Sequence, residues 1–160
     1  DGKTSRGTSA RGGRKRRHKR VVPIAGAPKQ LLLPWRQDLT AQDFARMLEE
    51  SGIGPAVIVL SACHSGSFID EIAAPDRLII TAARGDRTSF GCRDGAEWTE
   101  FGESFFDRAL RGEPDPRKAF PLAAEDVARK EAADGLTSSL PQMVEGVEIG
   151  PVLDRLLAGR

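Results

Sequence analysis

Cysteine is scarce in this chain. Its 160 residues include two cysteines, Cys63 and Cys92. Two thiols are too few for a small secreted domain held together by disulfides, and their separation does not match a zinc motif such as C-x-x-C. The low cysteine count suits a reducing compartment. We therefore expect neither a disulfide scaffold nor a metal site, and no organic cofactor is implied.

Long apolar runs are also missing. No run approaches the length that a transmembrane helix needs, so we expect no membrane span. The first residues are basic but lack the apolar stretch of a signal peptide. Together with the low cysteine count, this favours a cytoplasmic protein.

Charge is spread unevenly along the chain. Residues 1–20 hold nine Lys/Arg and one Asp, a net charge of +8, whereas the whole chain carries +1 and residues 21–160 therefore carry −7. The first segment is rich in Gly, Ser and basic residues and offers little to bury, so it cannot offset its ordering entropy. We predict a disordered basic tail over residues 1–28 and a folded domain over residues 29–160.

The remaining pattern predicts an α/β fold. AVIVLSA (residues 56–62) and LIIT (78–81) are short, continuous and β-branched, as in strands of a parallel sheet buried on both faces. The segment between them has room for a crossover with a short helix. Further helices are predicted at helical spacings and capping residues. We expect helices at 40–52, 69–73, 99–110, 117–133 (or from Pro121) and 150–157, and at most a short extended piece near 31–33.

The most informative segment is VLSACHSGSF, residues 59–68. Cys63 follows the carboxyl end of a predicted parallel strand, which is the edge where α/β proteins bind ligands. Small neighbours such as Ser61, which we assign to the substrate site, would let a substrate carbonyl approach. Backbone N–H groups there could hold a developing oxyanion. The position alone fits a nucleophile, but it also fits a small buried thiol.

Three blocks carry a resemblance to a known family. SACHSGSF, LIITAARGDRTSFGC and TEFGESFFDRAL resemble, in order and spacing, bacterial members of the legumain family of cysteine peptidases. This family includes asparaginyl endopeptidases and the catalytic subunit of GPI transamidase. The flanking pieces DLTAQDFARMLEESGI and SSLPQMVEGVEI fit as well, so the resemblance covers roughly residues 38–158.

The resemblance implies a three-layer αβα caspase-like fold with a mainly parallel sheet, although the first family strands are not recognisable before Ala56. It implies a Cys/His dyad that cleaves peptide or protein substrates through an acyl-enzyme. It places Ser89, Phe90 and Gly91 in the substrate site. Glu103 lies near an acidic pocket residue of legumains, but we interpret it as an ordinary helix carboxylate.

The family's His-Gly pair is absent. The two histidines are His18 and His64. His64 directly follows Cys63, and adjacent side chains on an extended backbone point in opposite directions. We therefore expect its ring to pack at the rim of the site and not to reach the sulfur. His18 lies 45 residues before Cys63, near the family's separation, and is the remaining candidate base.

The surroundings of His18 do not match the family, since RKRRHKR has no strand before it and no glycine after it. One explanation is that residues 1 to about 28 stem from a truncated or frame-shifted start; a continuous upstream reading frame would exclude this. Two alternatives to an active peptidase stay open. One is a pseudo-peptidase that keeps the fold for interactions. The other, less favoured because no aromatic platform or recognition motif accompanies it, is nucleic-acid binding through the basic tail.

Overall fold

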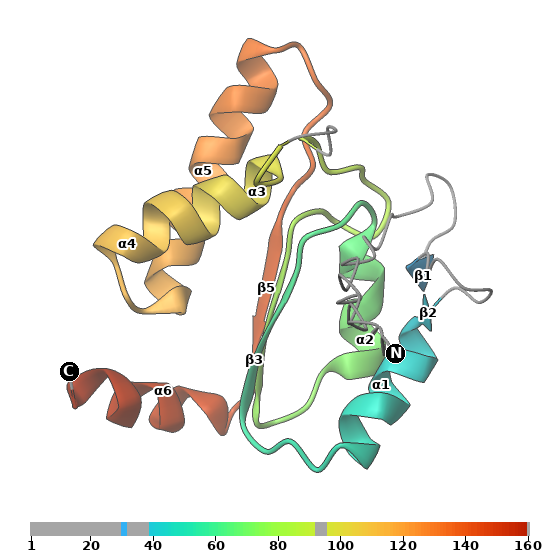
Figure 1. The fold of residues 1–160 in the computed structure, drawn as a ribbon, viewed down its shortest axis with the longest axis vertical. Helices are drawn as coiled ribbons and strands as arrows, with labels where there is room; N and C mark the ends of the chain where they lie inside the picture. The colour runs from blue at the N-terminus through green and yellow to red at the C-terminus, as the bar shows by residue number, and fades with distance from the viewer. Residues whose placement is uncertain (1–29, 32–38, 92–95, 160) are drawn as a thin grey trace, which may run out of the picture.

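A three-stranded sheet forms the centre of the fold. The computed structural model describes residues 30–31, 39–91 and 96–159 (Figure 1). Within these residues the strands of the sheet are β3 (Ala56–Leu60), β4 (Arg77–Thr81) and β5 (Gln142–Glu145), in the order β3-β4-β5. β3 pairs parallel with β4, and β5 pairs antiparallel with β4. The two strands predicted from the sequence are therefore present and parallel, and an antiparallel strand joins them.

A short hairpin precedes the first helix. β1 (Gln30–Leu31) pairs antiparallel with β2 (Leu39–Thr40). Thr40 then caps α1 (Ala41–Glu50), where its side chain accepts a hydrogen bond from the backbone N–H of Asp43 at 3.0 Å. The helix predicted at residues 40–52 is therefore present and begins after a capping threonine.

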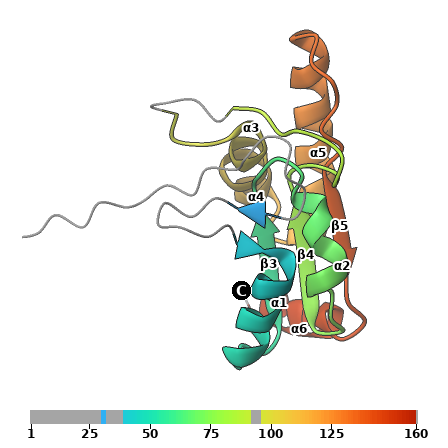
Figure 2. The same ribbon diagram turned by 90° about the vertical axis from the view of Figure 1, so that its right-hand side faces the viewer.

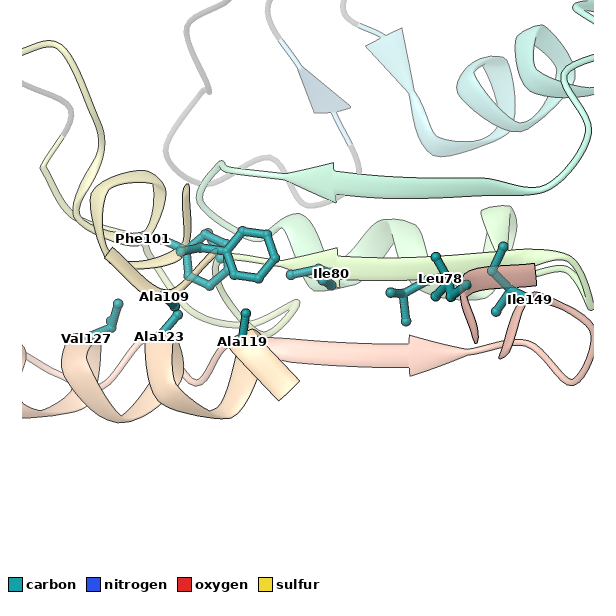
Figure 3. Packing of buried hydrophobic residues seen from close by; sticks show 11 residues of the cluster. Leu78, Ile80, Phe101, Ala109, Ala119, Ala123, Val127 and Ile149 are labelled. Carbon is teal, nitrogen blue, oxygen red and sulfur yellow. The ribbon is translucent and has the colours of Figure 1, made fainter. Parts of the chain in front are cut away.

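Helices cover both faces of the sheet. Neighbouring residues of β4 point to opposite faces, so its apolar side chains contribute to a core on each side. Ile79 packs with residues of α1 and α2 (Ile69–Ile72). Leu78 and Ile80 pack on the other face with α5 (Pro116–Ala133) and α6 (Ile149–Ala158), as Figures 2 and 3 show. The protein therefore has the predicted α/β fold, and the arrangement is compatible with a three-layer αβα caspase-like architecture.

The helix predicted at residues 99–110 is interrupted by a π-helical segment. It consists of α3 (Glu100–Gly102), the π-helix η2 (Glu103–Ala109) and α4 (Leu110–Gly112) in direct succession. The Thr99 side chain caps its start by accepting from the Gly102 N–H at 2.9 Å. Phe101 and Phe105 of this helix are buried, whereas Phe106 is 38% exposed.

Pro121 does not mark the start of the long helix, so this option from the sequence is wrong. α5 begins at Pro116, where the missing N–H of proline costs nothing, and Asp115 is its N-cap. Pro121 sits inside the helix and removes one backbone hydrogen bond. Burial of Ala119, Ala123 and Val127 in the core stabilises the helix across this position.

Two features of the sheet differ from the prediction. The sequence pattern predicts no strand at β5, which has only four residues, follows Pro141 and is partly exposed. β3 was expected to be buried on both faces and to reach Ala62, but it ends at Leu60 and Val57 is 41% exposed. Within the described residues β3 lies at the edge of the sheet, and β4 is the strand buried on both faces.

The Asp115 carboxylate at the start of α5 makes the stability of the fold depend on pH in the acid range. Its carboxylate is 4% exposed and accepts hydrogen bonds from the Arg117 side chain at 2.9 and 2.7 Å and from the Arg117 backbone N–H at 3.0 Å. The side-chain bonds from Arg117 are the main cause that lowers the pKa of Asp115 below its usual value. A carboxyl group whose folded pKa is depressed stabilises the fold above its unfolded pKa and loses that contribution as the pH falls through the folded value.

We expect Asp115→Asn to lower the free energy of unfolding at pH 7 by about 1.5 kcal/mol, the size of a hydrogen bond to a charged group. Asparagine keeps the N-cap, so the change isolates the charge. Urea titrations from pH 7 to pH 3 should show the gap between wild type and variant closing as the pH drops below about 4, the unfolded pKa of an aspartate. A gap that stays constant over this range would contradict the assignment.

Candidate functional site

Cys63 lies in the turn that follows the carboxyl end of β3. Its side chain is partly buried, which leaves the sulfur neither sealed in the core nor freely exposed. The thiol donates a hydrogen bond to the carbonyl of Ser89 at 3.2 Å, and the backbone N–H of Ser89 donates to the sulfur at 3.3 Å. The nucleophile predicted from the sequence therefore meets the predicted substrate segment, although 26 residues separate the two in the chain.

His64 adopts a left-handed backbone, with φ 57° and ψ 15°. The expectation of an extended backbone at this residue is thus wrong. The Nδ1 atom of the ring lies 3.1 Å from the carbonyl oxygen of Gly85, and the backbone N–H of His64 donates to Arg87 at 2.8 Å. Within the described part of the chain, the sulfur of Cys63 is bonded to the Ser89 backbone and to no imidazole. The ring therefore contacts the loop, in line with the predicted rim position.

Ser61 is held by a side-chain contact. Its hydroxyl lies 2.7 Å from the hydroxyl of Thr99, the residue that caps α3. This contact ties the strand that leads to Cys63 to the start of the helix. The sequence predicted Ser61 in the substrate site, and the structure places it two residues before the nucleophile with its hydroxyl engaged by Thr99.

Ser89, Phe90 and Gly91 form the end of the loop over the thiol. Ser89 is 8% exposed. The carbonyl of Phe90 accepts from the backbone N–H of Glu100 at 3.2 Å. Gly91 has φ 87°, and a Cβ atom there would lie 2.5 Å from the Glu100 nitrogen, so only glycine fits. This end of the loop is therefore held at Ser89 by the sulfur and at Phe90 and Gly91 by the start of α3.

A small cavity lies behind this loop. Its volume is about 30 Å³, room for little more than a water molecule, and Phe90, Gly91, Lys130 and Glu131 are among its lining residues. Glu131 is 3% exposed, and its Oε2 atom accepts from the Ser139 N–H at 3.0 Å. The Ser139 carbonyl in turn accepts from the backbone N–H of Arg84, where the loop over the thiol begins. No sequence motif indicates that a buried glutamate supports the loop in this way.

Charged groups near the site are paired. Glu103 forms ion pairs with Arg108 at 2.5 Å and with Lys130 at 3.3 Å. The hydrogen bond from Arg108 is the main cause that lowers the pKa of Glu103. At the start of the loop, two hydrogen bonds from Arg84 lower the pKa of Asp86 to about 2. Glu103, which we interpret from the sequence as an ordinary helix carboxylate, is thus engaged by two cations.

Some predicted features cannot be placed. His18, Cys92 and the basic tail lie outside the described residues.

Among the described residues, no group of three His, Cys, Asp or Glu side chains is arranged to hold a metal ion. None of the helices in this same part of the chain has the length and apolar character needed to cross a membrane.

Comparison with known proteins identifies the family. A search of curated proteins found no match. A scan against protein families matches residues 24–146, more than half of the chain, to the peptidase C13 family. This confirms the resemblance to legumain-type peptidases that the sequence blocks around Cys63 indicated. The chain therefore belongs to the peptidase C13 family.

Proposed function

We propose that this protein is a cysteine peptidase with Cys63 as its nucleophile. The observation that carries the proposal is the position of the thiol. It is partly buried at the carboxyl end of a parallel strand and touches the backbone of Ser89, in a chain of the peptidase C13 family. A thiol at this edge of the sheet can meet a peptide carbonyl that lies along the loop.

The reaction begins with removal of the thiol proton by an imidazole. The thiolate then attacks the carbonyl carbon of a peptide bond, and a C–S bond forms while the carbonyl electrons move to oxygen. Collapse of this intermediate breaks the C–N bond, and the amine leaves with the proton from the imidazole. Water, or a second amine, releases the acyl group and restores the thiol. His18 is the base that the sequence proposes, and it lies outside the described residues.

The substrate backbone would lie along Ser89, Phe90 and Gly91, near Ser61. Support comes from the contact between Ser89 and the sulfur, which puts the segment beside the reacting atom. In the present geometry, the N–H and C=O of Ser89 both bond to the sulfur. A substrate carbonyl must therefore displace part of this contact before the thiol can attack.

A panel of fluorogenic peptides, with asparagine or aspartate before the cut, tests the proposal. We expect wild type to cleave at least one peptide and Cys63→Ala to cleave none, because the alanine has no nucleophile. His18→Ala should also lose activity if His18 is the base. Cleavage that survives Cys63→Ala would remove Cys63 from the mechanism.

A second candidate function is a pseudo-peptidase that keeps the fold for protein interaction. One observation favours it: in the described residues no imidazole is bonded to the sulfur. A cysteine without an adjacent base lacks the usual means of activation and is a weak nucleophile. The same panel separates the two candidates, since a folded wild type that cleaves no peptide supports the pseudo-peptidase.

A further inference from the structure

The left-handed backbone of His64 is unusual for a residue with a side chain. A positive φ costs such a residue about 1 kcal/mol or more, and glycine or asparagine adopts it more readily. The backbone of His64 makes hydrogen bonds of its own: its N–H donates to the Arg87 carbonyl, and its carbonyl accepts from Ser67. These bonds do not depend on the side chain of residue 64. Glycine could make them without strain, so the imidazole is what His64 adds to the turn.

The imidazole contacts one atom of the loop over the thiol. A carbonyl oxygen only accepts hydrogen bonds, so the Nδ1 atom carries the proton and donates to Gly85 at 3.1 Å. Gly85 also lies tightly against the turn, because a Cβ atom there would be 3.1 Å from the Ser67 nitrogen. Four residues further along, Ser89 makes its two bonds to the sulfur. The loop is thus fastened to the turn at Gly85 by the ring, at Arg87 by the backbone N–H of His64 and at Ser89 by the thiol.

We propose that His64 is a positioning residue for Cys63. Its Nδ1–H group holds the Gly85–Ser89 loop on the turn, and the Ser89 backbone therefore stays against the sulfur and limits access to it. The inference rests on the proposed function only in treating Cys63 as the reactive group.

The test uses thiol alkylation, which needs no peptidase activity. In a Cys92→Ser background Cys63 is the sole thiol. The plateau that its rate of reaction with iodoacetamide reaches as the pH is raised reports access to the sulfur. His64→Gly keeps the left-handed turn and removes the donor. We expect it to react about fivefold faster than wild type, since loss of one hydrogen bond shifts the opening of the loop by about that factor.

Asparagine provides the matched variant. It tolerates the left-handed backbone, and its side-chain nitrogen occupies the same place in the side chain as Nδ1 of histidine, so His64→Asn should react at close to the wild-type rate. Aspartate has the same shape but lacks the donor, so His64→Asp should resemble His64→Gly. The Asn and Asp variants decide the matter if the glycine variant does not fold.

Equal rates in the asparagine and aspartate variants, or a wild-type rate in His64→Gly, would overturn the positioning role. A purely structural role would change the thermal midpoint without separating Asn from Asp in the alkylation rate. Absence of peptide cleavage by wild type, with the predicted order of alkylation rates, would remove the proposed peptidase function and leave this inference in place.

Discussion

Gly66→Ala is expected to destabilise the protein by about 3 kcal/mol, the upper end for inserting a methyl group where there is no space. A Cβ atom at residue 66 would lie 2.7 Å from the Gly85 nitrogen and 2.9 Å from the Ala83 carbonyl oxygen. Both are backbone atoms, which cannot rotate away as a side chain does. The Gly66 N–H also donates to the Ala83 carbonyl at 2.8 Å, so the two segments cannot separate without losing this bond.

Urea denaturation measures this effect, because the midpoint should fall while the m-value is unchanged. Gly54→Ala is the control. It introduces the same methyl group in the loop before β3, where nothing lies within 4 Å. We expect the control to stay within about 0.5 kcal/mol of wild type, as for most surface substitutions. Equal midpoints for the two variants would show that the turn after Cys63 tolerates a side chain at residue 66.

Most helices and the parallel strand pair could be predicted because their signals are local. The helix predicted from residue 40 is present with Thr40 as its cap, and the apolar runs of β3 and β4 pair as expected. β5 could not be predicted, since its four residues gain their strand conformation by pairing with β4, some sixty residues earlier in the chain. The possible helix start at Pro121 was wrong for a related reason. The packing of α5 in the core outweighs the loss of the hydrogen bond that proline removes.

The candidate site was predictable in its residues but not in its contacts. The blocks around Cys63 and Ser89 indicated both residues, and the structure brings them into hydrogen bonding. The left-handed backbone of His64 could not be predicted, because the carbonyl that its ring contacts belongs to Gly85, 21 residues later in the chain. The support of this loop by Glu131 depends on burial, which no short motif encodes.

The position of the site depends on the core beneath it. Phe101 is fully buried and stacks on Phe105, with ring centres 5.6 Å apart. Figure 3 shows its ring beside Ile80 of the sheet. Phe101 lies in the first turn of the helix that Thr99 caps, and Thr99 contacts Ser61 at 2.7 Å. Packing of Phe101 against Ile80 therefore stabilises the end of the helix that contacts the strand leading to Cys63.

We expect Phe101→Ala to lower the free energy of unfolding by about 3–5 kcal/mol, the cost of removing a buried aromatic ring and leaving a cavity. This is a large part of the 5–15 kcal/mol that stabilises a typical domain. Phe106→Ala, in the same helical stretch but 38% exposed, is the matched control and should cost less than half as much. If urea denaturation gave equal losses for the two variants, the buried aromatic stack would not be what stabilises this helix on the sheet. A loss for Phe101→Ala that is accompanied by faster alkylation of Cys63 in the absence of urea would show that the core also fixes the loop over the thiol.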